Sequence, residues 1–241
     1  MNLNVAHIFL MDTIIKEYNQ DITSTLRLLH LCSAYLPIGA YSYSQGIEWA
    51  VEAGWIKNEK QTQEWILGLL SYSLGRLDLP VLTRMYNAWQ EQKLSEITYW
   101  TNFLLASREA AELQAEDKHL GKALGKILFE LGCNEIVPYL QRDLSFATSF
   151  ALAGKFWNIP ITQLCAGYIW SWAENQTSAA VKLVPLGQTA AQRILDQIIN
   201  VSSTIIKQSF NIKDEDIGAL TIGLSIASAL HETQHTRLFQ S

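Results

Sequence analysis

Apolar residues recur along most of this chain at the three- and four-residue spacing of one face of an α-helix. The clearest case runs from Ile161 to Trp172, and a second one runs from Ile66 to Leu77. Dipeptides that favour β-hairpins, such as Asn-Gly and Asp-Gly, do not occur in the sequence. The pattern therefore predicts an all-α fold.

Prolines and polar residues place the ends of the expected helices. Pro185 lacks a backbone donor, so a helix should end just before it. Gln188 or Thr189 is then in position to cap the next helix. Because every proline stands at such a boundary, we expect about ten helices in one domain.

Two further helix starts are expected in the first half of the chain. Asn58 has a side chain that can cap a helix beginning at the next residue. Asp78 is expected to cap another helix, with Pro80 in its first turn, where proline is tolerated.

The chain divides into three expected segments. Residues 1–20 form an N-terminal extension, in which residues 3–10 are the one stretch where we allow a strand. Residues 21–230 form a single helical domain, and residues 231–241 form a polar tail that carries Leu238 and Phe239. An apolar pair in such a tail packs on its own domain, packs on a partner or frays.

Composition narrows the class of protein. With 49% hydrophobic and 17% charged residues among 241, the chain can bury a sizeable core. Its formal net charge of −5 argues against a nucleic-acid-binding protein, which is usually basic. No apolar run reaches the roughly 18 residues that a membrane span requires. The three cysteines form no Cys-x-x-Cys pair, so we expect a reduced, cytoplasmic protein.

A short motif near the end of the chain suggests one enzyme class. His231, Glu232 and His235 match the HExxH pattern of zinc metallopeptidases, in which two histidines bind zinc and the glutamate activates water. No His, Glu or Asp follows His235 to supply the usual third ligand. A metallopeptidase is therefore an alternative, and polar residues that cap or extend the last helix are the favoured interpretation.

Two acidic and two aromatic residues cluster near position 45. Glu48 and Glu52 lie one turn apart on a short expected helix, and as a general acid and base they would need a buried site. An exposed helix face is the favoured interpretation of this pair. Tyr41 and Tyr43 precede them and suit a contact surface, because aromatic residues are enriched in protein interfaces.

The corner between the two helices that meet at Pro185 carries Lys182, Gln188 and Arg193. These residues either bind a partner or cap and solvate the turn. No phosphate-binding glycine loop and no nucleophile–base arrangement can be recognised in the sequence. Residue chemistry alone therefore favours a helical binding or scaffold protein over an enzyme.

Three separated segments resemble signatures of the UreF family of urease accessory proteins. Residues 28–48 resemble the opening signature, residues 181–188 the central one and residues 231–241 the C-terminus of the family. The matches occur in the right order, and the resemblance covers about residues 22–241.

The chain departs from the family pattern at two places. Ala40 follows Gly39 where Gly-Gly is common, and His235 stands where tyrosine is usual. Because a family member with tyrosine there would lack the HExxH motif, the second difference weakens the metallopeptidase interpretation further.

The resemblance implies an all-α protein that forms a homodimer and acts as a nickel-insertion chaperone without being an enzyme. It implies that the chain bridges UreD, also called UreH, and the GTPase UreG, so that Ni²⁺ reaches apo-urease. Nickel is then handled by the complex, GTP is bound by UreG, and the chain itself holds no cofactor firmly. A generic helical interaction domain, which would bind neither partner, is a further alternative.

Two hypotheses about contacts follow from the resemblance. The first is that residues 233–239 become ordered when they dock into the UreD-type partner. The second is that Glu48 and Lys182 face the GTPase. The full set of expected partner-binding residues is Tyr41, Tyr43, Glu48, Lys182, Gln188, Arg193, His231, Glu232, Arg237, Leu238 and Phe239.

Overall fold

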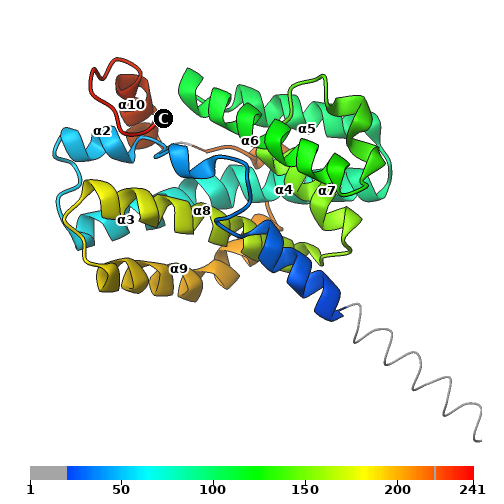
Figure 1. Cartoon of the computed structure of the whole chain (residues 1–241), viewed down its shortest axis with the longest axis horizontal. Coiled ribbons are helices and arrows are strands. Elements are labelled where there is room, and N and C mark those ends of the chain that lie inside the picture. Colours follow the sequence, from blue (N-terminus) through cyan, green and yellow to red (C-terminus); the bar gives the residue numbers. More distant parts are fainter. Residues whose placement is uncertain (1–20, 220) are drawn as a thin grey trace, which may run out of the picture.

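The computed structural model describes residues 21–219 and 221–241. Within these residues all regular secondary structure is helical and no strand occurs, which confirms the all-α prediction (Figure 1). The expected N-terminal extension, with its suggested strand at residues 3–10, lies outside the described residues. No helix in the described part of the chain is long and apolar enough to cross a membrane.

The described chain begins with a helix over residues 21–31. The later α-helices are α2 (Ile47–Glu52), α3 (Glu59–Leu69), α4 (Leu79–Gln90), α5 (Leu94–Ala106), α6 (Ala111–Glu130), α7 (Phe146–Phe156), α8 (Ile161–Leu183), α9 (Gln188–Ser209) and α10 (Ile222–His231). Four other helical segments are the 3₁₀ turns η1 (Ala40–Ser42), η3 (Asn134–Tyr139) and η4 (Asp214–Asp216) and the π-helix η2 (Leu70–Asp78).

The core is arranged around α4. This helix packs against α5, α7, α8 and α9, and α6 covers the other side of α7. Along α4, Leu79, Leu82 and Met85 are fully buried. Figure 1 places α4 in the middle of the molecule, with α10 and the residues after it at one end, beside α2. The polar tail therefore starts from a helix that packs on the domain.

The helix α4 begins after Asp78 with Pro80 in its first turn, as expected, but it continues the π-helix η2 without a break, and the expected capping by Asp78 is wrong. Asp78 has helical backbone angles and its side chain caps nothing, because its carboxylate instead pairs with Arg108. Pro80 still removes one helical donor, which would leave the carbonyl of Arg76 unpaired. The backbone N–H of Gly218 donates to that carbonyl at 3.2 Å.

The corner between α8 and α9 also differs from the expectation. The break before Pro185 is confirmed, since α8 ends at Leu183. However, neither Gln188 nor Thr189 caps α9, because the helix already begins at Gln188 and Gly187 holds the capping position without a side chain. By contrast, Asn58 caps α3 as expected, with its side-chain oxygen accepting from the backbone of Gln61.

Candidate partner-binding site

The tail (residues 231–241) turns back and packs on its own domain. Phe239 is 5% exposed, and Ser241 is buried. The backbone N–H of Gln240 donates to the carbonyl of Ser42 at 2.8 Å, and the N–H of Ser44 donates to the carbonyl of Ser241 at the same distance. The tail therefore packs on its own domain, which accounts for Phe239 but leaves Leu238 exposed.

Glu48 on α2 holds the backbone of the tail. Its Oε1 accepts a hydrogen bond from the N–H of Leu238 at 2.6 Å, and its Oε2 accepts one from the N–H of Phe239 at 2.9 Å. The residue is only 6% exposed, so the expected exposed helix face is wrong for Glu48, whereas Glu52 one turn later is exposed. Glu48 is therefore covered by the tail and is not part of the exposed surface.

His231, the last residue of α10, lies between two carboxylates. Its Nδ1 is 2.6 Å from Oε2 of Glu112, and its Nε2 is 3.1 Å from Oε2 of Glu48. Both ring nitrogens of His231 therefore contact carboxylates, one from α6 and one from α2. Arg237 of the tail pairs with the second oxygen of Glu112. His231 and Arg237 of the C-terminal region thus contact two carboxylates of the domain.

The arrangement of these residues argues against the zinc interpretation of the HExxH motif. Both ring nitrogens of His231 contact carboxylates, and α10 ends at His231, so the motif does not continue along one helix face to the exposed His235. The described residues contain no group of three or more His, Cys, Asp and Glu side chains that could hold a metal ion. Glu232, the motif's presumed base, accepts a hydrogen bond from the backbone of Ala111.

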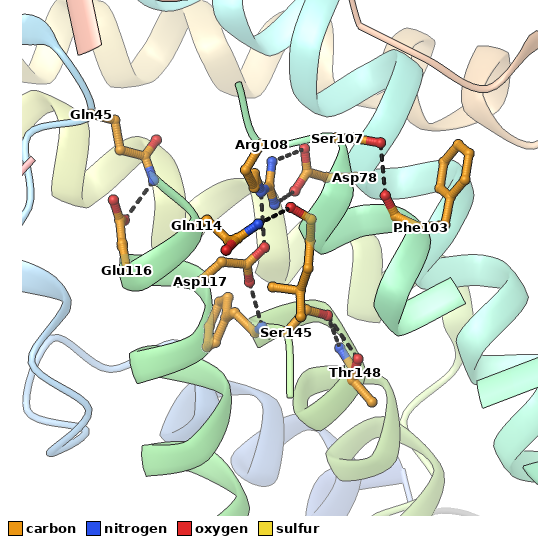
Figure 2. Close-up of polar contacts among 12 residues, drawn as sticks. Gln45, Asp78, Phe103, Ser107, Arg108, Gln114, Glu116, Asp117, Ser145 and Thr148 are labelled. Atoms are coloured by element: carbon orange, nitrogen blue, oxygen red, sulfur yellow. Dashed lines mark hydrogen bonds and ion pairs between the residues drawn. The ribbon is translucent and has the colours of Figure 1, made fainter. Parts of the chain in front are cut away.

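Glu116 on α6 binds the far end of the tail. Its Oε1 accepts from the side-chain amide of Gln45 at 2.7 Å, and its Oε2 accepts from the hydroxyl of Ser241 at 2.8 Å. Burial raises the pKa of Glu116 to about 7, although these two hydrogen bonds act in the opposite direction. Figure 2 shows Gln45 and Glu116 facing each other across the gap between their two segments.

A second buried charge cluster lies beside the first and is centred on Arg108 (Figure 2). The guanidinium pairs with Asp78 at 2.5 Å and with Asp117 at 2.8 Å, and the hydroxyl of Tyr168 donates to Asp78 at 3.2 Å. Burial by itself would lower the pKa of Arg108, but the charges of Asp78 and Asp117 raise it above its ordinary value. The cluster therefore ties η2 to α6 by ion pairs and to α8 by a hydrogen bond.

A cavity of about 590 Å³ opens between these two clusters and the corner of α8 and α9. Its lining includes Arg108 and Glu116, together with Tyr41, Lys182 and Gln188. Three of the expected partner-binding residues are thus brought to one place, and all three are exposed. Arg193 is exposed too, but it forms a bidentate pair with Glu59 and does not line the cavity.

The other expected partner-binding residues separate into exposed and buried groups. Leu238 is 64% exposed, and Glu232 and Arg237 also reach the surface. The buried residues are Tyr43, Glu48, His231 and Phe239. Lys182 lies over the ring of Phe239, 5.3 Å from its centre, so the tail reaches the corner of α8 and α9.

The sequence interpretation missed Glu112 and Glu116, which bind the tail from α6. They stand four residues apart and therefore lie on one face of the helix, which was a usable signal. It also missed the outer face of α10, where Ile222, Ile226 and Leu230 recur at four-residue spacing and are all exposed. These three residues form an apolar stripe on the surface, which we call the α10 stripe.

Several known proteins are similar in sequence to this chain over most of its length. The family model of UreF matches residues 56–199. The urease accessory protein UreF of Alkalilimnicola ehrlichii is 44% identical over 216 residues, which cover 89% of this chain and 95% of that protein. UreF of Hahella chejuensis is 44% identical over 90% of this chain and 97% of its own length, and UreF of a Marinomonas species is 41% identical over 96% and 100%. The chain therefore belongs to the UreF family of urease accessory proteins, a chaperone-type family and not a family of enzymes.

Proposed function

We propose that this chain is an adaptor in the maturation of urease, and that it bridges a UreD- or UreH-type protein and the GTPase UreG. In this proposal one surface is the α10 stripe with the tail, and the other is the mouth of the cavity between α6 and the corner of α8 and α9. The assembled complex handles Ni²⁺ and delivers it to apo-urease in the cytoplasm. GTP is bound by UreG, and this chain holds no cofactor of its own.

The observation that carries the proposal is the α10 stripe. Ile222 is 62% exposed, and Ile226 and Leu230 follow it on the same face of the helix. Exposed apolar side chains gathered on one face are typical of surfaces that bind another protein. Leu238 of the tail adds one more exposed apolar side chain after the same helix. We assign this surface to the UreD-type partner.

The mouth of the cavity supports a second, different partner. Tyr41 supplies an exposed aromatic ring, Lys182 a cation and Gln188 an amide. Interfaces are enriched in aromatic side chains, and exposed charges steer association and select the partner. Because Glu48 is covered by the tail, we assign only these exposed residues to the GTPase and give Glu48 an indirect role through the tail.

The helix over residues 21–31 supports the expected homodimer. Its apolar residues Ile22, Leu26 and Leu29 lie on one face and are exposed in the single chain. Residues at such spacing share a helix face, and a second copy of the chain would remove this face from water. We propose that this helix contributes to the contact between two copies.

Capture of each partner by paired variants tests the assignment. Ile226→Asp should weaken capture of the UreD-type protein by about tenfold or more, because it places a charge in the apolar stripe. Ile199→Asp, which changes an equally apolar and exposed residue on α9, is the matched control and should bind as the unchanged chain does. Equal capture by the two variants would contradict the role of the α10 stripe.

A second pair tests the other surface. Tyr41→Ala should weaken capture of the GTPase by about tenfold, because aromatic residues carry a large share of interface energy. Tyr72→Ala removes a ring of similar exposure on η2 and is the control. If neither partner is captured by the unchanged chain, a generic helical interaction domain becomes the better interpretation.

A further inference from the structure

The cavity between α6 and the corner of α8 and α9 contains a carboxylate that no other side chain neutralises. Glu174 of α8 lines this cavity and is partly buried. Within residues 21–219 and 221–241, its side chain takes part in no hydrogen bond or ion pair. Burial raises the pKa of Glu174, and no cation acts in the opposite direction. A desolvated carboxylate without a partner is costly in its ionised form, so the site favours the entry of a cation.

The other carboxylates of the cavity already have partners. Arg108 pairs with both Asp78 and Asp117. Glu116 accepts one hydrogen bond from a side-chain amide and one from a hydroxyl. Among the described residues that line the cavity, Glu174 is thus the one carboxylate that is left for a ligand from outside.

Lys182, which also lines the cavity, does not supply the missing cation. It follows Glu174 by eight residues on α8, which places it about 12 Å farther along the helix axis. Its ammonium group lies over the ring of Phe239, 5.3 Å from the ring centre. In the described lining, four acidic side chains face two basic ones, so the cavity favours a cation over an anion.

An independent observation points to a ligand that carries hydrogen-bond donors. Thr177 is 2% exposed and lines the same cavity, and its hydroxyl has no hydrogen-bond partner in the described part of the chain. Because residues three apart share a helix face, this hydroxyl and the carboxylate of Glu174 are neighbouring acceptors on α8. A buried hydroxyl without a partner costs free energy, and a bound N–H group that donates to it would remove this cost.

The rest of the lining suits a long side chain with a flat cationic end. The aromatic rings of Tyr41 and Trp172 line the cavity, and Tyr41 is 71% exposed. A guanidinium group pairs with a carboxylate through two N–H groups and also stacks on aromatic rings. Leu36 and Ile38 line the same space and can cover the methylene groups of an arginine side chain.

We propose that this cavity receives an arginine side chain of the GTPase partner, with Glu174 pairing with the guanidinium group and Thr177 accepting a further hydrogen bond from it. The inference rests on the proposed function, which assigns the mouth of the cavity to the GTPase. Tyr41 and Lys182 then contact the partner surface around the inserted side chain. Glu174 makes the site selective, because a neutral side chain would leave its carboxylate buried and unpaired.

Binding of a small probe to the full-length chain tests the site without the GTPase. The probe is N-acetylarginine amide, and N-acetylcitrulline amide, which has a similar shape but no charge, is its control. Binding is followed by the NMR signal of the Trp172 indole N–H. The arginine probe should bind at least about tenfold more tightly than the citrulline probe. Glu174→Gln should lose this preference, whereas Glu130→Gln, which changes an exposed residue outside the cavity, should keep it.

Equal or absent binding of the two probes to the unchanged chain, or an unchanged preference in Glu174→Gln, would overturn the proposal. Capture of the GTPase then separates this inference from the proposed function. Glu174→Gln should weaken capture by about tenfold, and Glu130→Gln should not. If Tyr41→Ala weakens capture and Glu174→Gln does not, the arginine site is contradicted and the proposed function stands. If the unchanged chain captures no GTPase, the proposed function fails, and the assignment of the arginine to the GTPase fails with it.

Discussion

Single side chains in this protein bind segments that lie far away in the sequence. Arg108 joins Asp78 of η2 to Asp117 of α6, and Glu48 of α2 holds the backbone of Leu238 and Phe239 in the tail. Each of these charges is largely buried, so each one depends on its partner for solvation. The effects of substituting them should therefore be much larger than those of substituting exposed ion pairs.

Substitution of Arg108 tests whether the buried charges of the second charge cluster matter more for stability than an exposed ion pair does. Arg108→Met leaves Asp78 and Asp117 buried without a cation, which should lower the free energy of unfolding by about 3–5 kcal/mol. Denaturation by urea, followed by circular dichroism, measures the loss. Arg193→Met breaks the exposed pair with Glu59 and should change stability little. Similar losses of stability in the two variants would contradict the claim that the buried ion pairs of Arg108 stabilise the fold more than the exposed pair of Arg193 does.

Removing Glu48 tests the tail. Glu48→Ala takes away the acceptor for two tail amides and should weaken tail docking by about 1.5–3 kcal/mol per hydrogen bond to a charged group. Exchange of the Leu238 and Phe239 amides should accelerate accordingly, while α2 stays folded. Glu52→Ala on the same helix is the control, because Glu52 is exposed. Unchanged exchange in Glu48→Ala would show that the tail is held by other contacts.

The sequence predicted the kinds of residue at the site but not which of them are covered. Helical spacing assigns Glu48 to a face of α2, yet nothing nearby in the chain says that the tail lies on that face. The polar tail with its apolar pair was visible, and packing on its own domain was one of the three stated outcomes. The structure selects that outcome for Phe239, whereas Leu238 remains on the surface.

Helices in this fold are placed by close backbone approach as well as by apolar faces. A Cβ added at Gly121 of α6 would lie 2.4 Å from the carbonyl oxygen of Leu144, just before α7. The hydroxyl of Ser149 on α7 also donates to the carbonyl of Gly121 at 2.7 Å. The contact between α6 and α7 thus requires glycine at this position.

Two glycine substitutions separate packing from helix propensity. Gly121→Ala should lower the free energy of unfolding by about 1–3 kcal/mol or more, because rigid backbone must move to accept the methyl group. Gly68→Ala on α3 meets no atom within 4 Å and should raise it by up to about 1 kcal/mol, since alanine is the better helix former. Thermal denaturation of both variants measures the difference. Equal effects would contradict the close approach of α6 and α7.

Element boundaries were predictable where local chemistry decides them. Asn58 caps α3, and α8 ends before Pro185, because both effects act within a few residues. The expected capping by Asp78 failed because its carboxylate is paired with Arg108, and the carbonyl of Arg76 accepts from Gly218, far along the chain. Long-range partners of this kind have no local signature.

At the scale of the whole molecule, the buried charged side chains hold distant segments of the chain together. The exposed apolar and aromatic side chains lie on two separate parts of the surface. The α10 stripe lies at one end, and Tyr41, Lys182 and Gln188 lie at the mouth of the cavity. Membership in the UreF family and this arrangement together favour a protein that acts by bringing others together.

Urease activation in a reconstituted mixture tests this account most directly. Apo-urease, Ni²⁺, GTP, the UreD-type protein and UreG are combined with and without this chain, and the urease activity that develops is measured. The account predicts activation that requires the chain and that falls strongly with Ile226→Asp but not with Ile199→Asp. Equal activation in the absence of the chain would contradict it.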